Sequence, residues 1–114
     1  MRIKLLIKPI SVNHAYPSSR YGRRFLSAEG KLYKALIAEA ALKECSQKLI
    51  GPIKIKYVFI FKDRRRRDVD DYVKLAQDSL TGIWFEDDCQ IVELIARKEY
   101  SSEEYSIEIE TYSD

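Results

Sequence analysis

The chain has 114 residues, of which 46% are hydrophobic and 33% are charged, and its formal net charge is +2. This composition is that of a folded protein, and the length corresponds to one domain, residues 1–114. Because the net charge is small, nucleic-acid binding through a uniformly basic surface is excluded, and only a local cluster of charges can support it.

The few cysteine and histidine residues exclude some kinds of site. Cys45 and Cys89 are the two cysteines and His14 is the one histidine, and they do not form a metal motif. Nothing suggests secretion, so reduced thiols in a cytosolic protein are expected. The apolar run in MRIKLLIKPI is too short for a signal peptide, and no stretch approaches a membrane span. We therefore expect a soluble cytoplasmic protein that does not bind a membrane.

The first elements along the chain are a strand and a long loop. Residues 2–8 alternate isoleucine and leucine with lysine, apart from Leu6, which is the period of a β-strand, and Pro9 ends it. Residues 11–25 are rich in Asn, Ser, Pro, Gly, Tyr and Arg and predict a loop. A loop of this length in a small domain is often functional.

A helix is predicted next. Ser27 can cap its start, and Glu29 lies in the first turn, where a negative charge is favourable. Gly51 and Pro52 are expected to end it. Apolar residues recur at helical spacing and predict its core face: Leu32, Tyr33, Leu36, Ile37, Ala40, Ala41, Cys45 and Leu49.

The second half of the chain predicts a strand, a helix and two more strands. Residues 53–61, IKIKYVFIF, have one apolar face and a second face that becomes apolar along its length, as expected for a strand that enters the sheet interior. Gly82 is expected to end the following helix. The sequences QIVELIAR and EYSIEIETY then predict two strands joined near Ser101 and Ser102. The core face of the second helix is expected to comprise Val69, Tyr72, Val73, Ala76, Leu80 and Ile83.

The predicted order is therefore strand, helix, strand, helix, strand, strand. We expect an α+β fold in a single domain, with a mixed sheet and two helices. The sequence contains no internal repeat and no linker.

Like charges are crowded together in DRRRRDVDDYVK, residues 63–74. The four consecutive arginines lie between Asp63 and a group of three aspartates, Asp68, Asp70 and Asp71. The arginines repel one another, and so do the aspartates. The arrangement therefore suggests that an anion binds the arginines and a cation binds the aspartates.

These charges can be placed on the predicted helix. Asp68 is a suitable N-cap, and Asp70 and Lys74 lie one turn apart on the same outward side. Residues 86–88, Glu-Asp-Asp, precede the third strand and would meet Asp68 and Asp70 if that strand ran back past the helix start. Oxygen ligands without a histidine or thiol cluster favour Mg²⁺ or Mn²⁺ over Zn²⁺. A metal beside arginines that bind phosphate suits phosphodiester hydrolysis.

Each feature also has a simpler interpretation. An aspartate before a helix is often only a cap, a helical Asp–Lys pair is often only an exposed ion pair, and arginine runs are commonly solvated. An EF-hand is excluded, because DVDDYVKLAQD lacks the glycine and the spacing of that loop. On pattern alone, a metal-dependent nuclease and a plain binding domain both remain open.

The stretch from Asp63 to Lys98 resembles the signature of the RusA family of Holliday junction resolvases. That signature has an arginine-rich strand end, an Asp-x-Asp-Asn motif with a lysine four residues after the second aspartate, and an aromatic residue and Asp-Asp ahead of a strand. KPISVNHAY and SAEGKLYK are similar to the family's opening segment. Asp71 departs from the signature, since the family usually has asparagine there.

The resemblance implies site residues that the pattern alone does not assign. A Mg²⁺ ion, or Mn²⁺, would be bound by Asp68, Asp70 and Asp88, and Asp87 is a weaker candidate ligand. Lys74 would be catalytic together with these three aspartates, by stabilising charge on the scissile phosphate or by orienting the nucleophile. The residues expected to contact the DNA backbone are Arg66 and Arg67.

The resemblance also implies a dimeric, RusA-like endonuclease that resolves four-way junction DNA by paired, symmetric cuts in recombination and repair. Because a four-way junction has two-fold symmetry, paired cuts need two equivalent sites, and a homodimer is expected. Two alternatives remain: a branched-DNA-binding protein that does not cleave, and a related Mg²⁺-dependent nuclease that acts on flaps or forks. Loop residues could extend the DNA surface or be merely solvated: Tyr16, Arg20, Tyr21, Arg23 and Arg24.

Overall fold

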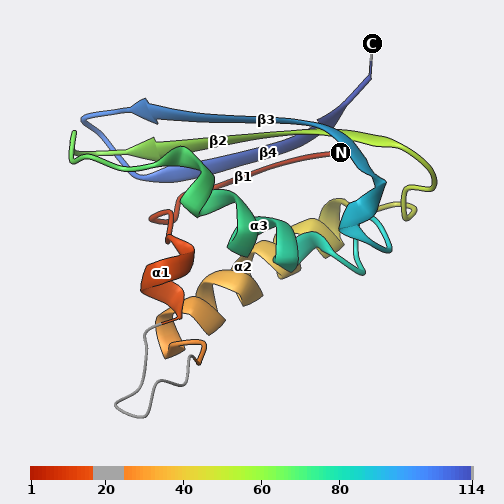
Figure 1. Ribbon diagram of the computed structural model, residues 1–114, viewed down its shortest axis with the longest axis horizontal. Coiled ribbons are helices and arrows are strands. Elements are labelled where there is room, and N and C mark those ends of the chain that lie inside the picture. Colours follow the sequence, from red (N-terminus) through yellow and green to blue (C-terminus); the bar gives the residue numbers. More distant parts are fainter. Residues whose placement is uncertain (17–24, 114) are drawn as a thin grey trace.

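A four-stranded mixed sheet forms one layer of the protein, and the helices cover one of its faces (Figure 1). The computed structural model describes residues 1–16 and 25–113, and most of the predicted 11–25 loop lies outside them. The strands lie in the order β1-β4-β2-β3. Their bounds are β1 Arg2–Leu5, β2 Ile53–Phe61, β3 Ile91–Tyr100 and β4 Ser106–Tyr112.

The sheet is mixed because β2 runs parallel to β3 and antiparallel to β4. β1 pairs with β4 in the antiparallel sense and forms one edge, whereas β3 forms the other. The last two strands, β3 and β4, are therefore neighbours in the chain but not in the sheet. The predicted α+β class with a mixed sheet is confirmed. The first strand is shorter than predicted, since it ends at Leu5 and the next residue is exposed.

Two longer helices lie on the covered face, α2 (Ala28–Glu44) and α3 (Val73–Leu80). A short helix, α1 (Val12–Ala15), precedes α2, and two 3-10 turns, η1 (Val69–Tyr72) and η2 (Asp88–Gln90), flank α3.

The start of α2 is as predicted, but its end and part of its core face are not. The Gly30 amide donates to Ser27 Oγ at 3.0 Å, which confirms the cap. The helix ends at Glu44, well before Gly51, because the chain turns there to reach the sheet. Leu32 is 60% exposed, so its predicted place in the core is wrong. The buried residues of α2 are Gly30, Tyr33, Ile37 and Ala41.

The second predicted helix is interrupted at its start. Val69–Tyr72 form a 3-10 turn, and the α-helical part begins only at Val73. Val69 and Val73 are half-buried, whereas Leu75, which the predicted face omitted, is completely buried. Gly82 has a φ of 89°, a backbone conformation that favours glycine, and this confirms its role after the helix end.

The core lies between β2 and the helices. The covered face of β2 carries Tyr57, Phe59 and Phe61, and the Phe61 ring packs edge-on against Tyr72 with 5.1 Å between the ring centroids. Trp84 is completely buried, and its Nε1 donates to the backbone oxygen of Ala41 in α2 at 2.9 Å. In the described ranges, no helix is long and apolar enough to span a membrane.

Candidate active site

Asp63 anchors the arginine segment that connects β2 with η1. Its carboxylate accepts two hydrogen bonds from Arg67, at 2.8 and 3.1 Å, and one from the hydroxyl of Tyr105, at 3.0 Å. The backbone amide of Arg65 also donates to it, at 3.0 Å. These hydrogen bonds, those from Arg67 first, hold the pKa of Asp63 well below its usual range. Asp63 is therefore a charged anchor for the backbone of this segment.

Arg67 is packed into the protein rather than presented to solvent. Its side chain is 9% exposed, and its guanidinium lies over the Phe61 ring, 4.1 Å from the centroid. The Nζ of Lys98 in β3 donates to the Arg67 backbone oxygen at 2.6 Å. Since Asp63 occupies both ends of the Arg67 guanidinium, this side chain is suited to positioning the residues that follow it.

The other arginines of the segment extend outward. Arg64 lies over the ring of Tyr100, 4.7 Å from its centroid, and Arg65 is 79% exposed. Arg66 is exposed, and no carboxylate in the described part of the chain forms an ion pair with it. The three exposed guanidinium groups can bind phosphate oxygens without first breaking a buried contact.

Two adjoining hollows connect these arginines with the aspartates. The first, of about 320 Å³, is lined by basic side chains, among them Lys8, Arg65 and His14, whose Nε2 lies 2.7 Å from a carboxylate oxygen of Glu29. The second, of about 400 Å³, has Asp68 and Asp71 in its wall. Arg66, Arg67, Ser11 and Tyr72 line both hollows. The two hollows thus join the basic side chains and the aspartates along one surface.

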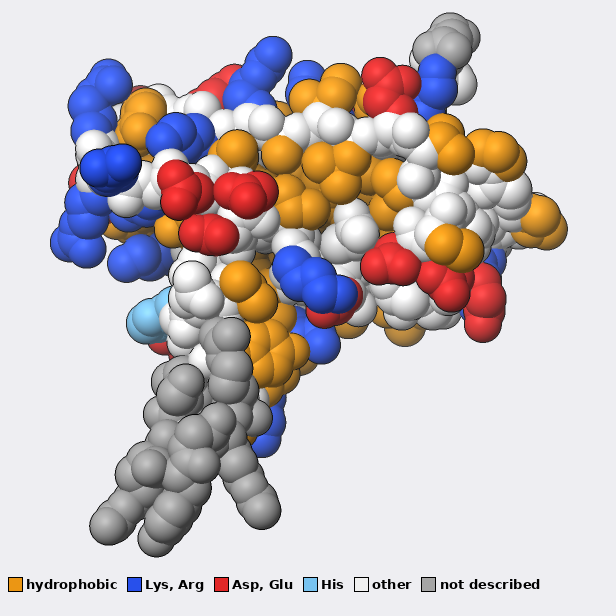
Figure 2. All heavy atoms as spheres, viewed as in Figure 1, with side chains coloured by type: hydrophobic (Ala, Val, Ile, Leu, Met, Phe, Trp, Pro, Cys, Tyr) orange, Lys and Arg blue, Asp and Glu red, His pale blue; other side chains and the backbone are white. Residues whose placement is uncertain are grey.

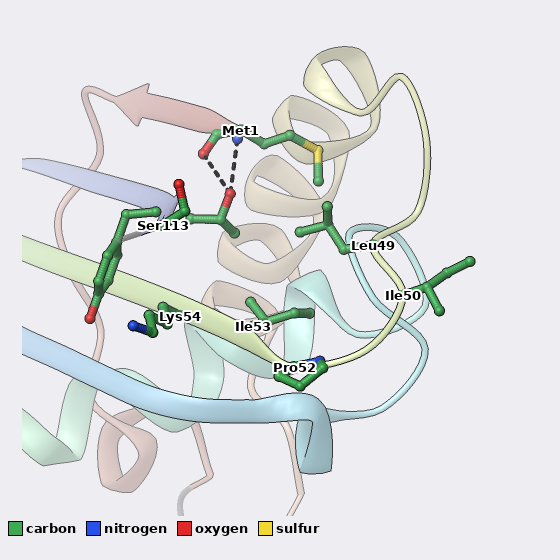
Figure 3. A pocket seen from close by; sticks show the side chains of 9 residues that line it. Met1, Leu49, Ile50, Pro52, Ile53, Lys54 and Ser113 are labelled. Atoms are coloured by element: carbon green, nitrogen blue, oxygen red, sulfur yellow. Dashed lines mark hydrogen bonds between the residues drawn. The ribbon is translucent and has the colours of Figure 1, made fainter.

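A larger hollow, of about 550 Å³, lies elsewhere, at the end of the sheet where the chain begins (Figure 3). Its walls come mainly from apolar side chains of the α2–β2 connection, such as Leu49, Ile50 and Ile53. The amino group of Met1 donates to Thr111 Oγ1 at 2.9 Å beside it. Among the described residues, its lining includes one lysine, Lys54, and no carboxylate, so it is not suited to the predicted chemistry.

The aspartates of the predicted metal site have few protein partners. Asp68 occupies the N-cap position of η1, and its backbone oxygen accepts from the Asp71 amide, but its side chain caps nothing. The predicted capping hydrogen bond is therefore absent, because the chain enters a 3-10 turn there. Asp68 and Asp70 are exposed and Asp71 is half-buried. No donor in the described part of the chain uses these three carboxylates, which leaves them available to an external cation.

Lys74 pairs with a residue that sequence reasoning missed. Its Nζ donates to Asp78 Oδ1 at 2.9 Å, one turn further along α3, rather than to Asp70. This hydrogen bond raises the pKa of Lys74, and the charges of Asp78 and Asp88 add to the effect. The spacing of four residues was the available signal for Asp78. Lys74 is thus held as an ammonium group by Asp78.

The acidic turn before β3 contains a structural residue and an exposed one. Asp87 caps η2 by accepting from the Cys89 amide at 2.9 Å, and Gln90 completes the capping box. This backbone hydrogen bond is the main cause of the lowered pKa of Asp87. Asp87 is therefore used by the turn, while the neighbouring Asp88 is exposed.

The structure does not gather all the predicted metal ligands in one chain. Among the described residues, no three His, Cys, Asp or Glu side chains lie close enough together to hold a metal ion. The reason is the crossover between the parallel strands β2 and β3, in which α3 runs back along the sheet. Asp68 and Asp70 precede this helix, and Asp88 follows it. Figure 2 accordingly shows acidic side chains in two groups, near the start of α3 and near the start of β3.

Comparison with known proteins agrees with these features. The sequence model of the family described as Endodeoxyribonuclease RusA matches residues 7–112. The chain is 41% identical over 90 residues to the crossover junction endodeoxyribonuclease RusA of Escherichia coli (strain K12), and the match covers 75% of this chain and 72% of that protein.

Relatives from other sources give similar values. The crossover junction endodeoxyribonuclease rusA of Enterobacteria phage 82 is 39% identical over 90 residues, and that of Shigella sonnei (strain Ss046) is 40% identical over 90 residues. Both matches cover 75% of this chain and 72% of the relative. The resemblance found in the sequence is thereby confirmed: the chain belongs to the RusA family of endodeoxyribonucleases.

Proposed function

We propose that this protein resolves Holliday junctions: it cleaves four-way DNA junctions by paired, Mg²⁺-dependent phosphodiester hydrolysis, as a cytoplasmic homodimer acting in recombination and repair. One observation supports this proposal above the others. The exposed carboxylates of Asp68 and Asp70 have no cationic partner among the described residues, and in the sequence they lie between the exposed arginines and Lys74, which pairs with Asp78. This arrangement offers adjacent places for a cation, a phosphate chain and a developing negative charge.

The metal ligands we propose in one protomer are Asp68 and Asp70, while metal binding by Asp88, which follows the other end of α3, stays a prediction. The donor set fits Mg²⁺, or Mn²⁺, because it consists of hard carboxylate oxygens without histidine or thiol. Mg²⁺ is commonly bound by one or two carboxylates together with substrate phosphates and water, so Asp68 and Asp70 suffice to begin a site. A bound Mg²⁺ would lower the pKa of the attacking water and stabilise the leaving oxygen.

Lys74 has a narrower role in this proposal than the sequence indicates. Because its hydrogen bond to Asp78 raises its pKa, it is protonated at neutral pH and cannot accept a proton from water. Its ammonium group can instead donate to a phosphate oxygen as negative charge develops on it. Asp78 would hold Lys74 in place by this pairing.

The arginines have two roles in the proposal. Arg64, Arg65 and Arg66 bind backbone phosphates from their exposed positions, which would give affinity without sequence selection. Arg67, which is packed against Phe61 and paired with Asp63, fixes the backbone just before Asp68. The DNA contact predicted for Arg67 remains a prediction.

The test is cleavage of a synthetic four-way junction in Mg²⁺ by the wild type and the Asp70→Asn variant, with a metal-free control. We expect paired symmetric nicks that disappear in the variant and without metal, while junction binding by the variant is retained. Asp71→Asn is the matched control, and it should keep cleavage, because this position is usually asparagine in the family. Binding without cleavage by the wild type in Mg²⁺ or Mn²⁺ would overturn the proposal.

Substrate choice is tested separately. A panel of four-way junctions, flaps and replication forks of matched sequence separates a resolvase from a nuclease for other branched DNA. Faster cleavage of the flap or the fork than of the four-way junction would replace the proposed substrate and leave the proposed chemistry intact.

A further inference from the structure

The outer edge of β3 is long, apolar and open. β3 has 10 residues, and no strand in the described part of the chain pairs with its outer side. Several of its apolar side chains are exposed: Val92 by 64%, Leu94 by 42% and Ile95 by 39%. Figure 2, viewed toward this edge, shows hydrophobic side chains between the two acidic groups. Such an edge offers unpaired backbone donors and acceptors and is prone to pair with another strand.

The other edge of the sheet is protected by contrast. β1 has only 4 residues, and its exposed side chains include Arg2, which pairs with Glu108 of β4 at 3.1 Å. Short edge strands and edge charges are the usual means of preventing edge-to-edge association. β3 contains no proline or glycine, and its one irregularity against β2 is a register shift near its start that leaves Val92 without a partner; from Glu93 to Tyr100 the pairing is regular. Of the two sheet edges in the described part of the chain, β3 is therefore the longer and the more open to association.

The charges on β3 are complementary to those of a second copy of the same strand. Two copies related by a two-fold axis pair in the antiparallel sense, and facing residues then lie on the same side of the joined sheet. If Ile95 lies opposite Ile95 of the second copy, Glu93 lies opposite Arg97 of that copy. The two-fold axis repeats this ion pair on the other side of Ile95. On the covered side, Leu94 lies opposite Ala96.

Alternative registers are less favourable. Facing residues of the two copies must point to the same face of the joined sheet. The two-fold axis must therefore pass through a residue that faces its own copy, such as Ile95 or Ala96. The pairing centred on Ile95 overlaps residues 91–99, and the one centred on Ala96 overlaps residues 92–100. The second places Glu93 opposite Glu99 of the other copy, and like charges directly opposite one another are destabilising. The charges thus select the register centred on Ile95.

The intramolecular partners of these charges remain compatible with that pairing. Glu93 lies 3.5 Å from Lys54 and is 50% exposed, and Arg97 lies 3.5 Å from Glu99 and is 56% exposed. All four side chains lie on the open face of the sheet. Pairing of Glu93 with Arg97 of the second copy would join these pairs into a row in which positive and negative charges alternate.

We propose that two copies of this protein associate through the outer edges of β3, antiparallel and centred on Ile95, so that the two sheets become one continuous sheet. The inference rests on the proposed homodimer and adds its surface and its register. The occupant of the edge is a second copy because the same strand supplies both members of each facing charge pair, as an isologous interface requires.

Charge exchange tests the register. The dissociation constant of the dimer is measured by sedimentation equilibrium, in buffer containing Mg²⁺, for Glu93→Arg, Arg97→Glu and the double variant. Each single variant places like charges opposite one another twice, and we expect it to weaken the dimer by about tenfold or more. The double variant restores opposite charges and should associate nearly as well as the wild type. Lys43→Glu, which breaks an exposed ion pair with Glu39 within α2, should leave association unchanged.

A cross-link tests the same register by distance. With Cys45 and Cys89 replaced by serine, Ile95→Cys should form an interchain disulfide on mild oxidation, because facing residues bring their Cα atoms within about 5.5 Å. Val92→Cys is the control. In this register the two copies of residue 92 lie roughly 20 Å apart along the strands, so they should not cross-link.

The possible failures are distinguishable. A dimer that is insensitive to the charge variants and does not cross-link at residue 95 would overturn the β3 interface and leave the proposed homodimer standing. A monomer at all concentrations would overturn both the interface and the homodimer. Absence of junction cleavage by the wild type, combined with a cross-link in the Ile95→Cys variant, would contradict the nuclease proposal and not the interface.

Discussion

Asp63 and Arg67 show that adjacent residues in a charged run can have opposite structural roles. Arg66 is exposed, whereas the next side chain, Arg67, is 9% exposed and its two guanidinium ends are bound to Asp63. The difference comes from Phe61 at the end of β2, whose ring provides a surface for the Arg67 guanidinium. The residue after this anchored arginine is the first predicted metal ligand, Asp68. Anchoring Arg67 therefore also fixes the start of the site.

The anchor predicts a pH-dependent stability. The hydrogen bonds from Arg67 lower the pKa of Asp63, so the folded state is stabilised above the ordinary aspartate pKa of about 4 and loses this contribution as the pH falls below it. Asp63→Asn should therefore lower the urea midpoint of unfolding at pH 7. The difference from the wild type should shrink at pH 3. A difference that is constant between these two pH values would show that the ionised carboxylate is not what matters.

A second prediction concerns Lys74. Its pKa is raised by the hydrogen bond to Asp78, and removing this partner should bring the pKa down. In Asp78→Asn, the alkaline limb of the single-turnover cleavage rate should move to lower pH, because the ammonium group is lost earlier as the pH rises. Lys74→Arg is the control, since the arginine guanidinium stays charged. Adding Asp78→Asn to Lys74→Arg should therefore leave the alkaline limb where it is in Lys74→Arg alone. An unchanged limb in Asp78→Asn would contradict a role for this pair in the rate.

At the scale of single residues, sequence reasoning was reliable where the physics is local. The Ser27 cap and the Gly82 helix end depend only on neighbouring backbone groups, and both were predicted. The anchoring of this segment also uses Tyr105, which binds Asp63, and Lys98 of β3, which binds the Arg67 backbone oxygen, and no local pattern could reveal these contacts. The exposure of Leu32 likewise depends on which side of α2 faces the sheet.

Among the elements, α1 is docked onto the start of α2 by a close backbone contact. The Ser27 amide donates to the Ala15 oxygen at 2.8 Å, and Ala15 is completely buried. A Cβ atom at Gly30 would lie 2.8 Å from a terminal carbon of Leu26 and 3.1 Å from the Cβ of Ala15. Glycine is therefore required here by packing rather than by backbone conformation. The contact matters for the site because Ser11, the N-cap of α1, and His14, within α1, line the basic hollow.

We expect Gly30→Ala to destabilise the protein although alanine favours helices. The gain in helix propensity is about 1 kcal/mol, and the overpacking against α1 costs about 1–3 kcal/mol, so the free energy of unfolding should fall by about 1 kcal/mol. Urea unfolding measures this change. Lys31→Ala, on the exposed side of the same helix, should change stability by less than about 0.5 kcal/mol. A more stable Gly30→Ala variant would mean that α1 does not pack closely on α2.

The arrangement of elements also explains why the predicted metal ligands are separated. The sequence correctly placed acids before and after the second helix, but the sense of β3 relative to β2 decides whether they meet. Parallel strands require the intervening helix to run back along the sheet, and the residues before the second strand then lie beyond the helix end. Strand pairing is a long-range property, since β4 inserts between β1 and β2 only after the whole chain is made.

At the scale of the whole molecule, charge is separated although the net charge is only +2. Basic side chains gather at the end of the sheet where β2 terminates, and the acids lie along the side next to them (Figure 2). A negatively charged DNA backbone would be attracted to the first region and repelled by the second unless a cation is bound there. The distribution therefore couples the position of the phosphate chain to the occupancy of the aspartate site.

This separation makes a quantitative prediction for DNA binding. Junction affinity should fall as salt is added, because phosphate contacts release counterions, and each contact contributes about 0.9 to the slope of log K against log salt concentration. In Arg65→Ala/Arg66→Ala, two exposed contacts are removed per protomer, so the slope should decrease by roughly 2 for each protomer bound. Titration of a labelled four-way junction at several salt concentrations measures the slope.

The matched control for this prediction lies on the opposite, open face of the sheet. Lys56→Ala removes a positive charge from that face, away from the arginine segment, and should leave the slope unchanged.

Arg67→Lys should behave differently from both the Arg65→Ala/Arg66→Ala variant and the Lys56→Ala control. Because Arg67 is bound to Asp63, lysine should lower stability through the loss of the two-point contact while changing the salt slope by less than the exposed arginines do. If Arg67→Lys changes the slope as much as the loss of an exposed arginine, Arg67 contacts DNA directly, and its pairing with Asp63 must open when DNA binds.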